Sequence, residues 1–394
     1  MVVKEYLRGH PLPSAQRVFA FGLGKAACAM TQALADETKL TDTLVITKHA
    51  FSLTVQPVTV IEGDHPIPGT ASVKAGKAAV KFASQLTPDD LLICLISGGG
   101  SALMTAPCVP LADLQALTFE LLACGARIDE INTLRRHLDQ LKGGGLAHFA
   151  ASRGARTVSL LLSDVVNASF EAIASGPTAA DLTTCADALS IIEKYKLKNK
   201  IPDSISQSLR ETLKPDNPIF DRVHNIVIAS NEIALFAAQA QAQSDGFQTK
   251  IIQMGMQGEA QVVGYELASK FRESLVEMRR PFCLLAGGET TVILKGKGKG
   301  GRNQELALAA VDVLAGLENI MFVSLATDGE DGPTDAAGAV VTGETAQRAG
   351  SLGMSAPDYL SRNDAYTFFA ALDDLIKTGP SGTNVNDLVF CFAF

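Results

Sequence analysis

The chain has 394 residues, of which 47% are hydrophobic and 19% charged, a composition typical of a globular protein with two or three domains. Its 34 lysines and arginines and 42 aspartates and glutamates give a formal net charge of −8, which argues against a broad nucleic-acid-binding surface. The apolar segments are strand-sized, well below the ~20 residues of a membrane span, and the N-terminus lacks the apolar stretch of a secretory signal. Seven cysteines occur singly, as in proteins that keep their thiols reduced. We therefore expect a cytoplasmic protein without nucleic-acid or membrane partners.

Short apolar runs alternate with glycine-containing turns and amphipathic segments along the first part of the chain. The expected strands are 17–21, 43–47, 58–61, 91–96 and 157–162, and the expected helices are 26–35, 71–85, 111–124 and 128–141. Some of these strands are apolar throughout rather than alternating, which favours a parallel sheet covered by helices on both faces. Strands that alternate with helices predict a doubly wound α/β fold.

The stretch 191–221 is more polar, with Lys194, Lys196, Lys198, Lys200 and three prolines, and we interpret it as a helical excursion or a connector. After it the alternation resumes. The expected strands there are 225–229, 249–252, 282–286, 290–294, 320–326 and 388–392, and the expected helices are 232–242, 259–276 and 306–314. We therefore expect two domains, 1–222 and 223–394, both of the α/β class.

A glycine-rich basic segment precedes the last of these helices. It contains Lys297, Lys299, Gly300, Gly301 and Arg302. Glycines allow the backbone to approach a ligand closely, helix N-termini attract anions, and arginine can hold a phosphate or carboxylate through two hydrogen bonds. The segment predicts a phosphate-binding loop; a flexible, solvated basic hairpin is the alternative.

A second glycine run directly follows the apolar segment 91–96. Its residues are Ser97, Gly98, Gly99, Gly100 and Ser101. Ligands of open parallel sheets bind beyond the carboxyl ends of the strands, and two hydroxyls beside bare backbone amides suit a carboxylate or a phosphate. We expect a binding role rather than a purely structural turn.

The turn after the first strand, Gly22-Leu23-Gly24-Lys25, resembles a degenerate dinucleotide fingerprint. A nicotinamide-binding domain then needs an acidic residue about 20 positions further on, at the tip of the second strand. That tip carries Lys48 and His49 instead, which suit a phosphorylated or carboxylated ligand better than a ribose. A turn that serves only strand–helix packing remains the other interpretation.

Carboxylates at other strand tips are candidates for proton transfer and metal binding. Asp164 follows the strand 157–162 and could be a general base, a metal-associated carboxylate or a turn former. Four carboxylates lie in the segment 328–335, of which we single out Asp328 and Asp335 as ligands of Mg²⁺; the alternative is an acidic surface loop.

Two further residues are candidates near the basic loop and the last strand. Glu289 could orient Arg302 or a metal-bound water, or could be a solvated strand-end carboxylate. Asn384 could line a binding cleft or simply stabilise a tight loop.

Several familiar motifs are absent from the sequence. There is no G-x-x-x-x-G-K-[ST] loop, no protein-kinase H-R-D or D-F-G signature and no G-x-S-x-G elbow. Glycine loops, local cations and an acidic cluster are nevertheless the parts that phosphoryl transfer requires. The residues by themselves therefore predict transfer from a nucleotide to a small acidic acceptor.

The motifs, taken together, resemble the class II glycerate kinases, a family whose members are often labelled glycerate 2-kinase and sometimes hydroxypyruvate reductase. The matching segments run through nearly the whole chain: FGLGK (21–25), GDHPIP (63–68), ISGGGSAL (96–103), SDV (163–165), ASGPT (174–178), LAGGETT (285–291), GGRNQE (300–305), TDG (327–329), DGPTD (331–335) and TNVND (383–387).

The resemblance implies a Rossmann-like N-terminal domain and a MOFRL-type C-terminal domain with a mixed sheet, with the active site in the cleft between them. It implies ATP- and Mg²⁺-dependent phosphorylation of D-glycerate, expected at the 2-hydroxyl. In the family a lysine at the tip of the second strand and the arginine of the G-G-R-N-Q-E loop are thought to act in the active site, and here these are Lys48 and Arg302.

We expect Lys48 and Arg302 to neutralise the transferring phosphoryl group, and Ser97–Ser101 to hold the glycerate carboxylate or the nucleotide phosphates. Asp164 would accept the hydroxyl proton, and Asp328 and Asp335 would hold Mg²⁺. The alternatives are an NAD(P)-dependent hydroxypyruvate reductase and a non-catalytic protein that binds sugar acids or nucleotides. The oligomeric state stays open, with a homodimer as one possible assembly.

Overall fold

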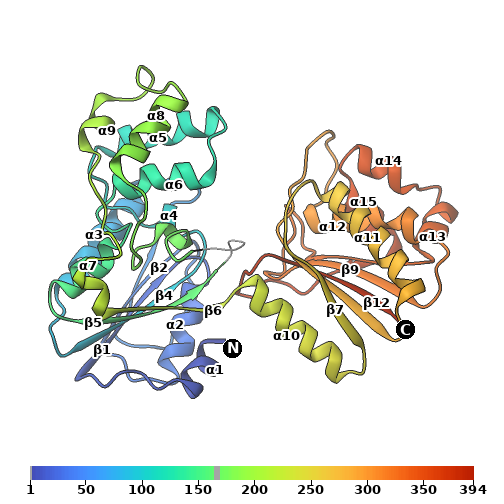
Figure 1. Cartoon of the computed structure of the whole chain (residues 1–394), viewed down its shortest axis with the longest axis horizontal. Helices are drawn as coiled ribbons and strands as arrows, with labels where there is room; N and C mark the ends of the chain where they lie inside the picture. The colour runs from blue at the N-terminus through green and yellow to red at the C-terminus, as the bar shows by residue number, and fades with distance from the viewer. Residues whose placement is uncertain (1, 164–168) are drawn as a thin grey trace. The chain divides into compact units, whose positions relative to one another are not determined.

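The computed structural model describes residues 2–163 and 169–394, and the chain divides into two compact units, Met1–Ile228 and Ala229–Phe394 (Figure 1). We had expected the division after residue 222. The strand β6 (Val223–Ala229) pairs within the first sheet, however, so the first unit continues through most of it. No helix in the described parts of the chain is long and apolar enough to cross a membrane.

The first unit is built on a six-stranded sheet with the order β3-β2-β1-β4-β5-β6, and the pairs from β3 through β5 are parallel. Its other strands are β1 (Arg17–Leu23), β2 (Asp42–Thr47), β3 (Thr59–Glu62), β4 (Asp90–Ile96) and β5 (Arg156–Leu162). This order is that of the doubly wound dinucleotide-binding fold, in which the crevice lies where the order reverses, between β1 and β4.

Helices cover both faces of this sheet, as Figure 1 shows. On one face, Phe21 and Cys94 pack with Phe82 of α3 (Thr70–Ser84) and Leu146 of α7 (Gly145–Ala151). On the other, Val45 packs against α2 (Ala27–Ala35). Burial on both faces explains why β4 is apolar from Leu91 to its end at Ile96.

A helical part extends from this sheet and has its own core. Leu117, Leu134 and Ile191 belong to its cluster of buried residues. Its helices are α5 (Leu111–Ala123), α6 (Ile128–His137), α8 (Cys185–Lys194) and α9 (Asp203–Ser208). The polar stretch 191–221 thus includes α9 and the end of α8, as the interpretation of a helical excursion predicted. The remaining short elements of the unit are α1 (Val2–Gly9), α4 (Gly100–Leu103), η1 (Ile173–Ser175) and η2 (Pro218–Arg222).

The second unit contains a mixed six-stranded sheet with the order β11-β10-β9-β12-β8-β7, in which only β7 and β8 are parallel. The strands are β7 (Gln248–Met256), β8 (Phe282–Gly288), β9 (Ile320–Ala326), β10 (Gly338–Thr342), β11 (Leu375–Ile376) and β12 (Asp387–Ala393). The helices are α10 (Asn231–Ser244), α11 (Ala260–Glu277), α12 (Arg302–Leu314), α13 (Thr345–Ser351), α14 (Ala356–Ser361) and α15 (Ala365–Leu372). The α/β class and the mixed sheet are as expected.

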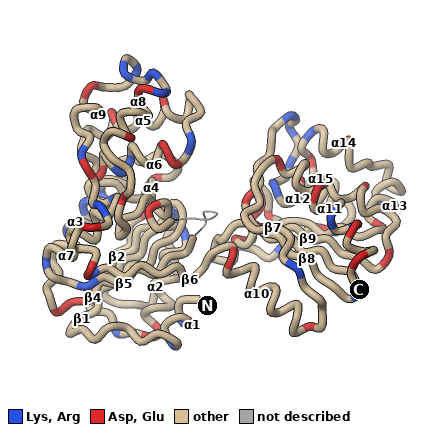
Figure 2. Tube along the Cα trace, viewed as in Figure 1, with Lys and Arg blue, Asp and Glu red and all other residues tan. Residues whose placement is uncertain are grey.

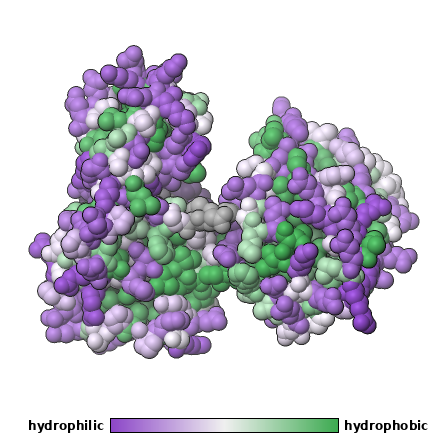
Figure 3. All heavy atoms as spheres, viewed as in Figure 1, coloured by the Kyte–Doolittle hydropathy of each residue, from purple (hydrophilic) through white to green (hydrophobic). Residues whose placement is uncertain are grey.

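The two faces of the second sheet are also both covered. Phe282 and Phe322 pack into the main core with residues of α11, α12 and α15, whereas Leu285 packs with Leu235 of α10 on the opposite face. Lysines, arginines and acidic residues are interspersed over each unit (Figure 2), and hydrophobic side chains gather on the visible face of the first unit beside its sheet (Figure 3).

Two expected elements are wrong. The segment 290–294 is a loop rather than a strand. The carbonyl of Ile293 accepts a hydrogen bond from the side chain of Asn363, and the only ladder contact of the segment with any described residue is an isolated bridge between Thr291 and Glu259. The helix expected over 128–141 ends at His137. Beyond it the backbone pairs with the segment 106–108 instead: the amide of Cys108 donates to the carbonyl of Leu138, and the amide of Gln140 donates to the carbonyl of Ala106. The Asp139 carboxylate also accepts the amide of Leu141.

Candidate active site

The turns after β1 and β4 are bonded to each other at the point where the strand order of the first sheet reverses. The amide of Lys25 donates to the carbonyl of Gly98 at 3.0 Å, and the amide of Ala26 donates to Ser97 Oγ at 3.0 Å. Gly24 has a φ of +116°, and a Cβ there would lie 2.4 Å from the Ser97 carbonyl oxygen. A glycine is therefore required for the two turns to approach this closely.

The glycine run after β4 leaves backbone donors without acceptors. No hydrogen bond from the amides of Gly98, Gly99, Gly100 or Ser101 is found among the described residues. Gly98 and Gly100 are buried, and Gly99 has a left-handed φ of +85°. Buried amides are nearly always paired, so a row of free donors at the switch point is the arrangement expected for an oxyanion site.

Cations surround this row. Lys25 follows β1 and the exposed Lys48 follows β2, and neither has a side-chain hydrogen bond or ion pair among the described residues. His65, from the loop after β3, is partly buried, and its pKa lies below its ordinary value because of burial and the charges of Lys25, Lys48 and Arg135. At neutral pH its imidazole is therefore uncharged, and the positive charge of the site comes from the lysines and Arg135.

Arg135 was missed in the sequence. It stands in the last turn of α6, beside Arg136 and His137, and this run of three basic residues was the only available signal. With Ser101 it lines a narrow indentation. Ser101 Oγ lies 2.8 Å from Ser175 Oγ, and Ser175 donates to Asn132 Oδ1 at 3.3 Å, so the glycine run is tied to α6.

In the second unit Arg302 is the first residue of α12 and is held by two carboxylates. Its Nε and Nη2 donate to the two oxygens of Asp387 at 2.6 and 3.1 Å, and its Nη1 donates to Glu289 at 2.7 Å. Burial opposes the charge of Arg302, but the hydrogen bonds and charge of Asp387 outweigh it and raise its pKa. Of the two functional roles considered for Glu289, the structure shows contact with Arg302. Asp387, at the start of β12, was missed as a site residue.

Asp331 is a further residue that the sequence analysis did not single out. This buried carboxylate accepts the amides of Asn303 at 3.1 Å and Gln304 at 2.9 Å, in the first turn of α12. Burial raises its pKa to about 6, although these amides favour its charged form and lower the value. Two of the donors at the start of α12 are thus already bound within the unit.

The basic loop before α12 lies against the segment between α14 and α15. Asn363 Oδ1 accepts the amides of Lys295 and Gly296, and Asp364 Oδ1 accepts the amide of Lys299. Lys299 Nζ stands 3.9 Å from the centre of the Tyr366 ring. The loop is therefore not a free hairpin, and part of its backbone is already bonded.

The end of this loop keeps free donors. The amides of Gly300, Gly301 and Arg302 have no acceptor among the described residues, and the exposed side chain of Lys297 has no partner there either. A Cβ on Gly301 would lie 2.3 Å from Asp331 Cγ, so glycine at this position serves the approach of Asp331. Ligand binding by Lys297, Lys299, Gly300 and Gly301 stays a prediction.

The predicted metal ligands have different surroundings. Asp328 is partly exposed, accepts the amide of Glu330 at 3.2 Å, and contributes to the raised pKa of Asp387, so it lies near the Arg302 pair. Asp335 is exposed and bound by Tyr366 Oη at 2.7 Å and Lys377 Nζ at 3.0 Å. The carboxylate of Asp328 thus has no ion pair to break among the described residues, whereas Asp335 would first have to release a lysine.

The other predicted site residues are less informative. Asn384 accepts the amide of Asn386 at 2.9 Å and so stabilises its own loop, as one of its two interpretations proposed. Asp164 lies outside the described residues.

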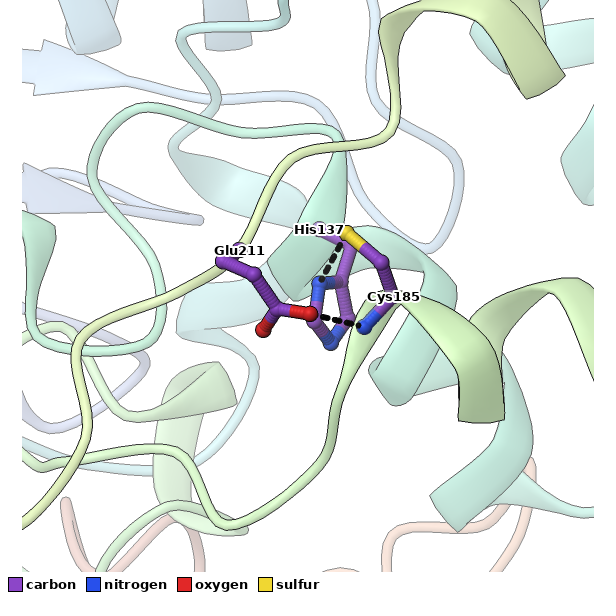
Figure 4. A group of neighbouring side chains, drawn as sticks. All are labelled: His137, Cys185 and Glu211. Atoms are coloured by element: carbon purple, nitrogen blue, oxygen red, sulfur yellow. Dashed lines mark hydrogen bonds between the residues drawn. The ribbon is translucent and has the colours of Figure 1, made fainter.

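Among the described residues, one group of three potential metal-ligating side chains converges, formed by His137, Cys185 and Glu211 (Figure 4). His137 Nδ1 lies 2.7 Å from the carbonyl oxygen of Arg210 and must therefore donate a proton to it. Burial raises the pKa of the Cys185 thiol, and Glu211 raises it further. A protonated nitrogen and a protonated thiol are poor metal ligands, and the contacts instead join α6 to the segment around residue 210.

Comparisons with known proteins agree with the motifs. Residues 2–210 match a domain of unknown function, DUF4147, and residues 282–387 match the MOFRL family. The chain is 42% identical over 388 residues to glycerate 2-kinase of Pyrococcus horikoshii, with 95% of this chain and 86% of that protein covered. It is 39% identical over 385 residues to a putative hydroxypyruvate reductase of Agrobacterium vitis, covering 94% and 98%.

The fold has a close counterpart among solved structures. The crystal structure of a glycerate kinase from Thermotoga maritima superposes with a TM-score of 0.92 at 37% identity, covering 100% of this chain and 94% of that one. Fold and matches together define a class of two-unit α/β phosphotransferases. Within it, the chain belongs to the glycerate kinase family, as the sequence motifs predicted.

Proposed function

We propose that the protein is an ATP-dependent kinase that phosphorylates D-glycerate at its 2-hydroxyl with the help of Mg²⁺. The observation that carries the proposal is the row of free amides from Gly98 to Ser101, with Lys25 and Lys48 on neighbouring strand ends. Backbone donors and lysines are the groups that stabilise the charge on a transferring phosphoryl group. Membership in the glycerate kinase family supports the choice of substrate.

The second unit would contribute Arg302. Asp387 and Glu289 hold its guanidinium in one orientation, so little reorganisation would be needed when negative charge develops nearby. The free amides of Gly300 and Gly301 would bind a further anionic group, and Asp164 would accept the proton of the substrate hydroxyl. If Lys48 and Arg302 act on the same phosphoryl group, replacing both with Ala should cost far less than the product of the single effects.

Mg²⁺ fits the second unit on electrostatic grounds. Asp387, Glu289, Asp331 and Asp328 lie near Arg302, so a bare polyphosphate bound at this arginine would meet several negative charges. When bound, Mg²⁺ would neutralise part of the charge on the phosphates. Asp328 is the ligand that its surroundings favour, and a role for Asp335 requires that it leave Lys377.

The test is an assay of ADP release with D-glycerate, ATP and Mg²⁺, followed by phosphorus NMR of the product. The expected product is 2-phosphoglycerate, and formation of 3-phosphoglycerate would contradict the proposed position. Absence of ADP release while ATP and D-glycerate still bind would favour a non-catalytic binding protein. Oxidation of NADH by hydroxypyruvate would favour the reductase alternative, which Lys48 at the position of the expected ribose-binding acid argues against.

A further inference from the structure

Arg135 is a partly buried cation that lacks a partner. Its Nε is buried without an acceptor, and no hydrogen bond or ion pair joins its guanidinium to any described residue. Arg136 Nε also lacks a well-aligned hydrogen bond, but Arg136 and Lys142 both have a carboxylate partner: Arg136 Nε lies 3.0 Å from Asp181 Oδ1, and Lys142 Nζ lies 2.5 Å from Asp139 Oδ2. Removing a guanidinium from water without compensation costs several kcal/mol, so an unpaired one is expected where an anion binds.

The pocket beside Arg135 is small and carries one net positive charge. Its walls include the hydroxyls of Ser101 and Thr105 and the apolar Leu114, and they lie so close together that a ligand enters only when these side chains move apart. Lys142 and Asp139 also line it, but they neutralise each other and leave the charge of Arg135. The single net charge suits a monoanion, whereas a nucleoside triphosphate carries several charges, and the hydroxyls of Ser101 and Thr105 can bond to a ligand that also carries hydroxyl groups.

The electrostatic contacts of Arg135 are repulsive in the protein alone. The charge of Arg135 contributes to the lowered pKa of His65 and, after the larger effect of burial, to that of Lys142. Burial also lowers the pKa of Arg135 itself. Burial is the largest cause of each of these shifts, and a carboxylate placed between the groups would oppose it by favouring their charged forms and would offset the repulsion that Arg135 exerts on His65 and Lys142.

Arginine and lysine side chains in this unit suit different anions. A guanidinium presents a planar fork that matches a planar carboxylate, whereas a lysine offers a mobile point charge that suits a phosphoryl group. Arg135 is fixed on α6, and Asn132, one helical turn earlier, accepts the hydroxyl of Ser175, which contacts Ser101. Lys25 and Lys48 instead stand at strand ends beside the free amides.

We propose that Arg135 binds the carboxylate of the hydroxy-acid substrate and thereby selects acids over neutral polyols. The inference rests on the proposed function for the identity of the acid. The phosphoryl group would then be bound by the other donors of the unit, Lys25, Lys48 and the amides of Gly98–Ser101. The carboxylate and the phosphoryl group of the reaction are thus assigned to different residues.

The experiment compares the wild-type enzyme with Arg135→Gln and Arg135→Lys. The matched control is Arg153→Gln, because Arg153 is exposed and its side chain has no partner among the described residues. In Arg135→Gln the KM for D-glycerate, and its Kd measured by calorimetry, should rise about 10- to 100-fold, the value of a lost charged hydrogen-bond pair. The KM for ATP should stay nearly constant. Arg135→Lys should recover part of the loss, and the preference for D-glycerate over glycerol should fall in parallel with affinity.

The stability of Arg135→Gln separates binding from a structural role. Because Arg135 has no partner to lose, this variant should unfold at the same denaturant concentration as the wild type or a higher one. A rise in the KM for ATP with unchanged glycerate affinity would overturn the proposal in favour of a phosphate contact. Unchanged values for both ligands would overturn it as well.

Failure of the proposed kinase function would give a different result from failure of the proposed role of Arg135. A wild-type protein that binds D-glycerate but does not phosphorylate it would contradict the kinase, while the calorimetric comparison with Arg135→Gln would still decide the role of Arg135. If the wild-type protein binds no D-glycerate, the role of Arg135 fails too.

Discussion

Arg302 and Asp387 form a two-pronged ion pair in which Nε and Nη2 of the arginine lie 2.6 and 3.1 Å from the two carboxylate oxygens. Asp387 is 1% exposed, and burial raises its pKa, so its charged form depends on this partner. A residue proposed to stabilise the phosphoryl group is therefore also part of the folded structure. Its removal has two consequences that an experiment must separate.

Arg302→Ala should lower turnover about 100- to 1,000-fold through the lost charge stabilisation. It should also destabilise the second unit by about 3 kcal/mol, because Asp387 stays buried without its partner. The double variant Arg302→Ala/Asp387→Asn should regain most of that stability without regaining turnover. Denaturant unfolding and the ADP-release assay measure the two effects. Recovery of activity in the double variant would mean that Arg302 acts only through the fold.

Lys48→Ala should show the catalytic effect without a structural one. The side chain is exposed and unpaired among the described residues, so the unfolding midpoint should match that of the wild type, while turnover falls about 100-fold or more. Lys39→Ala is the matched control, because Lys39 is an exposed, unpaired lysine that precedes β2 rather than following it. Equal turnover in the two variants would remove Lys48 from the mechanism.

The fold of the first unit was largely predictable from the sequence. Apolar segments such as β4 are buried on both faces, and such burial leaves a continuous signal that requires no knowledge of partners. Contacts between distant segments were less visible. The helix expected to reach residue 141 stops at His137 because of bridges to the segment near Cys108, and nothing in the local pattern indicates them.

The candidate site was predictable where a motif carried it. Ser97–Ser101 and Arg302 stand out because runs of glycine and clustered cations are rare. Arg135 and Asp387 do not, because a short run of basic residues at the end of a helix and a single aspartate before a strand are both common. Arg135 is distinguished only by its burial without a partner, and Asp387 only by its burial against Arg302. Two further glycines of the basic loop, Gly296 and Gly298, serve packing within the unit, because a Cβ there would collide with Arg362 or Asp364.

Gly24→Ala tests the close contact between the turns after β1 and β4. The substitution imposes an unfavourable φ and places a methyl group 2.4 Å from the Ser97 carbonyl oxygen. Gly125 also has a positive φ, +70°, but nothing lies within 4 Å of its Cβ position, so Gly125→Ala measures the cost of φ alone. That cost should be about 1–2 kcal/mol, and Gly24→Ala should exceed it clearly in denaturant unfolding. Equal costs would show that the turns can separate without penalty.

Asp331 should make the stability of the second unit depend on pH. Its pKa of about 6 in the folded protein exceeds the ordinary value of 3.8, so the folded state holds the proton more tightly than the unfolded state. The stabilising contribution of this proton is complete below pH 4 and is lost as the pH rises through 6, by up to about 3 kcal/mol. Burial is the main cause of the raised pKa. Of the groups that face Asp331, Asp387 raises the pKa further, the backbone amides of Asn303 and Gln304 and the side chain of Asn303 lower it, and Arg302 lies near enough to interact with the carboxylate.

Asp331→Asn isolates this contribution, because the amide cannot titrate. The difference in unfolding free energy between the wild type and this variant should shift against the wild type as the pH rises from about 4 to 7. Denaturant unfolding at several pH values measures it, and Asp312→Asn, an exposed aspartate on α12, controls for general charge effects. A difference that grows in favour of the wild type instead would show that the helix amides hold the carboxylate ionised. The start of α12 would then be a preformed anion site occupied by Asp331, able to bind a ligand only if Asp331 moved away.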